Sequence, residues 1–372
     1  MAVEKNIYIK SLHRPFNTRL ITCKWVCQFA EKYNGINFKN HFFIFIIDLL
    51  YKNYQKEDGN IFGLPAKETV NALYDYISNH EDIDKDLERF NDPSKKNLTD
   101  IDKKLFSNLK AVSYYITLSK NLNLLGSKHI LTIYGLEFVK LKSSPKHFMN
   151  LTPKEQIYFF TKILENDFIP FLFSIHFYRL KKKYQPTDTE RQEGDNRYLK
   201  LLDAFLEIRE FNYKQSSWEN YIKVRESWIE DLELLSNGYY GLKPSYMRII
   251  NDNPQHQAIY EEISTTMLKF ENDLFKTLDK YRNFKLDFYH AYMKIKKKMI
   301  FNNIGYVNLY DIKQELNISF SELESMLNRL ANDDNNRKYL FFNNIIAAVD
   351  HRKRFKVKTT PVLNIRITKA LK

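Results

Sequence analysis

The chain has 372 residues, which is enough for two or three domains with cores of their own. Apolar residues make up 44% of the chain and aromatic residues 15%, and this composition excludes a largely disordered protein. Because only 9 Gly and 10 Pro interrupt it, the sequence disfavours a loop-rich β-sandwich and Gly-rich phosphate loops. Long segments without such breakers predict a mainly α-helical protein.

The charge balance is basic, with 58 Lys and Arg against 45 Asp and Glu and a formal net charge of +13. Clustered cations gain affinity for nucleic acids by releasing counterions from the phosphates. Such clusters occur at residues 294–298 and 351–358. They favour a nucleic-acid-binding protein, and the alternative is a well-solvated basic surface.

The two cysteines, Cys23 and Cys27, stand four apart without partner cysteines or a nearby His pair. We therefore expect a reduced pair and no zinc site. The residues that open the sequence show no signal-peptide pattern. The most apolar window, residues 42–50, is far shorter than the ~20 residues that span a bilayer. These features predict a cytoplasmic protein with no membrane association.

The first third of the chain is predicted to be helical. Asn34-Gly35 ends the first helix, Pro65 begins the third, and Thr99 caps the fourth. Together with the apolar periodicity, these signals predict helices over residues 18–33, 41–54, 65–79, 99–109 and 110–122.

A tight hairpin is predicted after these helices, with Leu124-Leu125 as its first arm and Lys128 at its tip. The second arm runs into Leu131-Thr132-x-x-Gly135, which starts a new helix. This order resembles winged-helix domains and predicts a winged-helix-like unit at about residues 99–150. Lys128 is then a candidate phosphate contact.

Two further helices are predicted over residues 152–166 and 169–183, the first with a strong start at Thr152-Pro153 followed by Glu155. In order of elements, residues 15–180 resemble the recognition regions of type IIS restriction endonucleases of the FokI and AlwI kind. The resemblance implies DNA recognition by successive winged-helix-like units. The chain departs from that family in lacking a following PD-(D/E)xK nuclease module.

The polar stretch 181–196 is the best candidate for a domain linker, since it contains Pro186 and Gly194. It divides the chain into an N-terminal domain, residues 1–180, a helical middle domain, residues 197–284, and a C-terminal domain, residues 285–372. Helices are predicted in the later part over residues 197–211, 217–235 and 257–284.

The C-terminal domain begins with an amphipathic basic segment, residues 287–301, and a short extended piece at 305–307. A helix is predicted over residues 309–316. After a turn, Ser319 and Glu322 form a capping box for another helix. The apolar residues on one face of that helix are Leu323, Leu327 and Leu330.

Two apolar runs follow, within residues 339–349 and at 362–367, and between them lies the basic stretch 351–358. They predict a hairpin with a basic tip. The order helix, short strand, helix, turn, helix and hairpin resembles a winged helix-turn-helix. The fold class is therefore predicted to be mainly α, with two winged-helix-like units that carry short β-hairpins.

The candidate DNA-binding residues belong to this C-terminal domain and to the first hairpin. Phosphate contacts are predicted for the hairpin, the basic helix and the first tip, and base contacts for the helix after Ser319. The phosphate-binding candidates are Arg352, Lys353, Arg354, Lys356, Lys358, Lys294, Lys297, Lys298 and Lys128, and the base-reading candidates are Asn328 and Arg329. Because Glu322 and Glu324 would repel phosphates, the same helix is also a candidate protein-docking element.

No catalytic constellation, metal site or cofactor motif is found in the sequence. We predict a DNA-binding subunit, not itself an enzyme, that positions a partner on double-stranded DNA in a restriction or anti-phage defence system. The partner is expected to be a nuclease, a methyltransferase or an ATPase. One alternative is a winged-helix scaffold that bridges such a partner through protein contacts. Another is a nuclease with a metal site built from distant segments.

Overall fold

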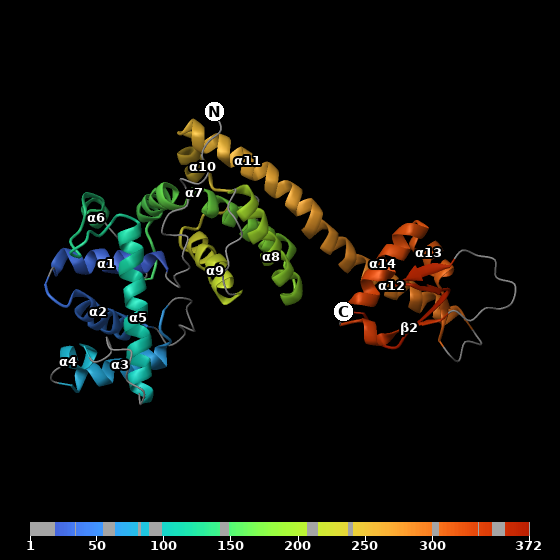
Figure 1. Ribbon diagram of the computed structural model, residues 1–372, viewed down its shortest axis with the longest axis horizontal. Helices are drawn as coiled ribbons and strands as arrows, with labels where there is room; N and C mark the ends of the chain where they lie inside the picture. The colour runs from blue at the N-terminus through green and yellow to red at the C-terminus, as the bar shows by residue number, and fades with distance from the viewer. Residues whose placement is uncertain are drawn as a thin grey trace. The chain divides into compact units, whose positions relative to one another are not determined.

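The computed structural model describes residues 19–33, 35–54, 64–80, 83–88, 99–141, 149–206, 215–236, 241–299, 305–333, 335–343 and 354–371 (Figure 1). The protein is mainly α-helical, and its few short strands form small antiparallel sheets. The helical class predicted from the sequence is therefore confirmed. The chain divides into two compact units, Met1–Leu268 and Lys269–Lys372.

The helices of the first unit are connected by short turns or by segments outside the described residues. They are α1 (Leu20–Lys32), α2 (Phe38–Asn53), α3 (Lys67–Ser78), α4 (Ile83–Glu88), α5 (Asp100–Asn121), α6 (Ile133–Val139), α7 (Pro153–Tyr184), α8 (Asp188–Phe205), α9 (Gln215–Asp231), α10 (Pro244–Asn251) and α11 (Pro254–Phe270). None of the helices in the described ranges combines the length and the apolar character needed to cross a membrane.

Helix α5 is the centre of the first part of this unit, where it packs against α1, α2 and α3 (Figure 1). Thr99 caps it, accepting a hydrogen bond from the Asp102 amide while its own amide donates to the Asp102 carboxylate. The prediction of two helices in this stretch, 99–109 and 110–122, is wrong, since a single helix runs through. No Gly or Pro separates the two halves, and Leu109, Val112 and Ile116 remain on one buried face.

Helix α7 consists of two helical segments joined across a kink at Asp167, whose φ and ψ are −147° and 33°. The break predicted between residues 166 and 169 is therefore confirmed. Pro170, three residues further on, has no N–H to donate within the helix. The buried Asp167 carboxylate accepts two hydrogen bonds from Arg225 of α9, at 2.6 and 2.7 Å. Burial raises the pKa of Asp167, and the guanidinium opposes that shift. The side chain at the kink therefore pairs with Arg225 of α9.

The predicted linker, 181–196, is largely helical. Helix α7 continues to Tyr184 and ends at Gln185 in the left-handed conformation, with φ of 43°. Helix α8 begins at Asp188, where the Thr187 amide donates to the Glu190 carboxylate at 2.9 Å. Most polar residues of this stretch lie on the exposed faces of α7 and α8. The boundary between the two compact units lies inside α11.

A small turn with a single β-bridge joins α5 to α6. Helix α5 is followed by Asn123 with a φ of 60°, and Leu125 and Leu131 form the bridge. The Gly126 amide donates to the Ile130 carbonyl at 2.8 Å. The next helix then starts at its N-cap, Thr132. The hairpin predicted from the sequence at this place is reduced to one bridge.

The same arrangement joins α9 to α10. Glu233 after α9 has a φ of 47°, and Leu235 and Leu242 form an isolated bridge. The Ser236 amide donates to the Gly241 carbonyl at 2.9 Å, and the N-cap of the next helix is Lys243.

The two connections also agree in the hydrogen bonds that close them. The N-cap amide donates to the leucine that follows the left-handed residue: Thr132 to Leu124 at 3.1 Å, and Lys243 to Leu234 at 2.9 Å. The first unit therefore contains the same helix–bridge–helix motif twice, as α5–α6 and α9–α10. The second copy was not predicted from the sequence, because the two copies share few side chains beyond a Leu-Leu pair and one later Leu.

In the first copy of the motif, the backbone leaves no room for a side chain at Gly135. A Cβ built on Gly135 would lie 2.1 Å from the Leu124 carbonyl oxygen, whereas one on Gly241 meets nothing within 4 Å. We expect Gly135→Ala to lower the free energy of unfolding by about 3 kcal/mol, because a backbone carbonyl cannot yield to the new methyl group. Gly241→Ala is the matched control and should change it little. Urea unfolding followed by circular dichroism measures both, and equal midpoints would contradict the close approach.

The second unit contains the π-helical segment η4 (Glu271–Phe275), α12 (Lys276–Lys298), β1 (Val307–Asn308), α13 (Leu309–Leu316), α14 (Phe320–Asn332), the 3₁₀ turn η5 (Arg337–Tyr339), β2 (Leu340–Asn343), β3 (Phe355–Val357), β4 (Thr360–Val362) and β5 (Asn364–Ile367). One antiparallel sheet has the order β1-β5-β2, and β3 pairs with β4. The core of the second unit consists of apolar residues of α12, α13, α14 and the strands, among them Phe288, Leu323, Leu327 and Ile365.

Candidate functional site

The described part of the basic C-terminal hairpin is the pair β3–β4, in which Phe355 pairs with Val362 and Val357 with Thr360. Its tip is the two-residue turn Lys358-Thr359. Strand β5 follows β4 after Leu363 and pairs with β2, with Asn343 opposite Asn364.

The position of the tip corrects the sequence prediction, which put residues 351–358 there. Lys356 lies within β3, and Lys358 is in the turn with a φ of 55°. The apolar run predicted at 345–349, together with Arg352 and Lys353, lies outside the residues that the structure describes. Arg354 is described and half-buried just before β3.

Helix α14 holds β3 through two side chains one turn apart. The Glu324 carboxylate accepts a hydrogen bond from the Lys356 amide at 2.7 Å. The Asn328 side chain donates to the Lys356 carbonyl at 2.6 Å and accepts from the Lys358 amide at 2.5 Å. Two polar side chains thereby satisfy two backbone groups of an edge strand and one of the turn that follows it. We call this set of contacts the α14–β3 clasp.

Aromatic packing supports the clasp. The rings of Phe320 and Phe355 stack with their centroids 4.2 Å apart and their planes at 12°. The Tyr310 ring of α13 lies 5.2 Å from that of Phe355 between centroids. Phe320, Glu324 and Asn328 follow one another at intervals of four residues, so one whole face of α14 is occupied by the hairpin.

This packing bears on both residues predicted to read bases. Asn328 uses its carboxamide in the clasp and donates also to the Glu324 carbonyl at 2.8 Å. Arg329 is directed toward α12, where it donates to the Thr277 carbonyl at 3.3 Å and its guanidinium lies 4.3 Å from the Tyr281 ring centroid. Base contacts by either side chain would require these interactions to be exchanged.

The acidic residues of α14 are also engaged. The Ser319 hydroxyl accepts from the Glu322 amide at 3.1 Å, which is half of the predicted capping box. The Glu322 carboxylate pairs with Lys280 of α12 at 2.6 Å instead of returning to the N-cap. The repulsion of phosphates expected from Glu322 and Glu324 is thus reduced by a nearby cation and a backbone N–H, respectively.

The predicted lysines of α12 differ in their surroundings. The Lys294 ammonium donates to the Glu315 carboxylate, and this hydrogen bond lowers the pKa of Glu315. Lys297 and Lys298 are exposed at the end of the helix. In the first unit, Lys128 is exposed in the turn between α5 and α6.

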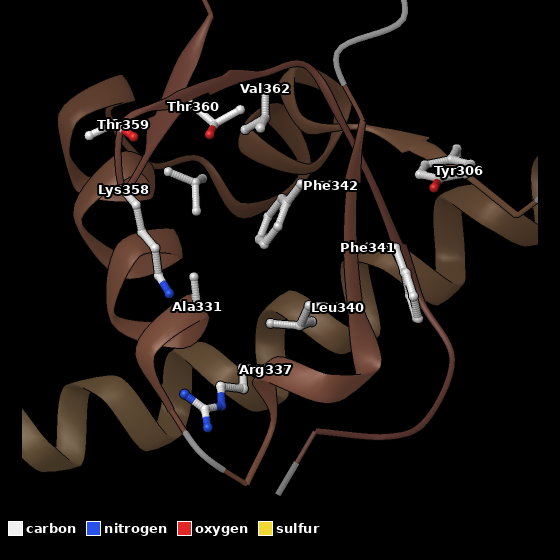
Figure 2. Close-up of a pocket in the computed structure, with 11 residues that line it drawn as sticks. Tyr306, Ala331, Arg337, Leu340, Phe341, Phe342, Lys358, Thr359, Thr360 and Val362 are labelled. Atoms are coloured by element: carbon white, nitrogen blue, oxygen red, sulfur yellow. The ribbon is translucent and has the colours of Figure 1, made fainter.

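A groove of about 660 Å³ lies between the hairpin and the end of α14. Lys358 and Arg337 line it together with the hydroxyls of Thr359 and Thr360, and Leu340 and Phe342 form part of its apolar wall (Figure 2). None of the described residues that line it is acidic. Arg337 and the two threonines could not be predicted from the sequence, because their proximity depends on where the hairpin turns.

Metal-ligating side chains do not gather elsewhere either: the described ranges contain no group of three or more His, Cys, Asp or Glu placed to hold an ion. Cys23 and Cys27 are buried free thiols, and burial raises the pKa of both. No protein-family model matches the chain, and no match was found among curated proteins or solved structures. The function must therefore be inferred from the geometry alone.

The clasp can be tested by amide hydrogen exchange. We expect Glu324→Ala to accelerate exchange of the Lys356 amide about tenfold, because a hydrogen bond to a charged acceptor is removed. Asn328→Ala should do the same for the Lys358 amide. Ser325→Ala, an exposed position on the same helix, is the control and should leave both rates unchanged. Identical rates in all variants would show that α14 does not hold the strand.

Proposed function

We propose that the second unit is a winged helix that binds duplex DNA through its basic hairpin. The element order α12-β1-α13-α14-β2-β3-β4-β5 and the sheet order β1-β5-β2 support it, since the pattern resemblance in the sequence rests on the same succession.

The observation that carries the proposal is the clasp. It occupies one face of α14 and fixes the backbone of β3 and of the turn, while the side chains of Lys356 and Lys358 project from it and are exposed. Neither ammonium group has an ion-pair partner among the described residues. Two cations on a fixed backbone suit phosphate contacts, which position a protein on DNA without reading its sequence.

Other basic side chains extend this surface in the proposal. Lys297 and Lys298 would contact the backbone from the end of α12, and Arg352, Lys353 and Arg354 remain sequence predictions for the same role. Asn328 is assigned to positioning the hairpin rather than to bases. The protein would then act as a DNA-positioning subunit for a nuclease, methyltransferase or ATPase, as in a restriction or anti-phage defence system.

Neutralising the two hairpin lysines tests the proposal. We expect Lys356→Gln/Lys358→Gln to weaken binding to duplex DNA, because fewer counterions are released from the phosphates. The slope of log K against log salt concentration should become shallower by about 0.9 for each phosphate that the variant no longer neutralises. Fluorescence anisotropy across a salt series measures both quantities.

The matched control is Lys338→Gln/Lys369→Gln, which removes the same charge from two exposed lysines whose ammonium groups lie over the Tyr339 ring. It should preserve the salt dependence of the wild type. Equal slopes for both double variants and the wild type would reject the hairpin as the DNA-binding element.

A second candidate function is a scaffold that binds a partner protein. The observation in its favour is an apolar patch on and before α6, where Ile130, Ile133 and Leu136 are 54%, 67% and 46% exposed. In the second helix–bridge–helix motif the positions of Ile133 and Leu136 are held by Pro244 and Met247. Contiguous exposed apolar residues are typical of protein contacts. A stoichiometric partner that co-purifies with a protein unable to bind DNA would favour this function.

A further inference from the structure

Two basic side chains meet at the connection between α5 and α6. The Lys120 Nζ, in the last turn of α5, lies 3.2 Å from the His129 Nε2. An ammonium group can only donate hydrogen bonds, so the imidazole nitrogen accepts here and the ring is neutral. Two groups that would repel each other if both were charged are thus held within hydrogen-bonding distance.

Packing independent of Lys120 holds His129 in place. Its ring stacks on Phe38 of α2, with the centroids 4.7 Å apart and the planes at 5°. Its backbone is in the left-handed conformation, with φ of 60°, and its amide donates to the Gly126 carbonyl at 3.2 Å. The imidazole therefore cannot move away from the lysine without losing the stack or the turn.

The pKa of the His129 imidazole reflects its surroundings. Burial lowers its pKa and the Lys120 ammonium lowers it further. Lys128 precedes it in the turn and is exposed, and Lys39 follows Phe38 on α2. His41, also on α2, is directed to Asp84, with Nε2 3.5 Å from the carboxylate. An anion placed at Lys120 and His129 would offset the repulsion that keeps the imidazole neutral.

We propose that Lys120 and His129 form a phosphate-binding site, with Lys128 at its rim. When a phosphate group arrives, the imidazole takes up a proton from solvent. The protonated Nε2 and the Lys120 Nζ then both donate to phosphate oxygens, as charge-assisted hydrogen bonds. The ligand is a phosphate group, either free or in a DNA backbone. Only the second source depends on the proposed DNA-binding function.

Binding at this site is therefore coupled to protonation of His129. The pKa of His129 should rise when phosphate binds, and affinity should increase as pH falls toward the ordinary histidine pKa and below it. The experiment is an NMR titration of the histidine ring protons of the full chain against pH, with and without inorganic phosphate. We expect saturating phosphate to raise the pKa of His129 by about one unit, a tenfold change in proton affinity.

His256 provides an internal control. Its ring stacks on Phe168 with the centroids 4.1 Å apart, and burial lowers its pKa as it does that of His129. Its pKa should not respond to phosphate. An unchanged His129, or equal shifts of both residues, would overturn the proposal, because the second result is a general effect of ionic strength.

A variant tests the role of the lysine. Lys120→Gln keeps most of the length of the half-exposed side chain and removes its charge, so the pKa of His129 in the free protein should rise and its response to phosphate should shrink severalfold. A response equal to that of the wild type would overturn the site. Repeating the titration with duplex DNA assigns the source: a shift with both ligands supports a backbone phosphate, and a shift with inorganic phosphate alone supports a free one. The salt series on the hairpin lysines tests the DNA-binding function separately.

Discussion

The surface that the second unit offers to a ligand depends on the α14–β3 clasp. A short edge strand has backbone groups that pair either with side chains or with water, and side-chain hydrogen bonds fix the position of the strand where water would not. Glu324 and Asn328 provide those partners one helical turn apart. This has two consequences. The helix face that makes these bonds is not available to a ligand, and the strand that it holds presents its lysines from a fixed backbone.

In both units, basic side chains stand at tight turns whose backbone is satisfied internally. Lys358 lies in the hairpin turn with its amide bonded to Asn328, and His129 lies in the α5–α6 turn with its amide bonded to Gly126. In both turns the backbone amide finds a partner within its own unit.

Local signals predicted the elements well. The helix over Leu309–Leu316, the N-cap Ser319 and the start of α7 at Pro153 are where caps, proline and periodicity place them. Predictions failed where a boundary depended on packing. Helix α5 continues through a stretch interpreted as a break, because Leu109, Val112 and Ile116 form one buried face. The break predicted between residues 166 and 169 is confirmed as the kink at Asp167. The predicted position of the hairpin tip was wrong, because the pairing of β3 with β4 sets the turn and the density of basic residues does not.

The sequence by itself determined the helical class, most helix starts, the buried leucines of α14 and the basic character of the chain. These properties depend on interactions between residues a few positions apart and on composition. Only the tertiary structure decided which polar side chains remain for a ligand. The side chains of Asn328, Arg329 and Lys294 are of the kinds that bond to bases or phosphates. In this unit Asn328 bonds to β3, Arg329 to α12 and Lys294 to the Glu315 carboxylate. Spacing shows which face of a helix a residue occupies, but not what packs against that face.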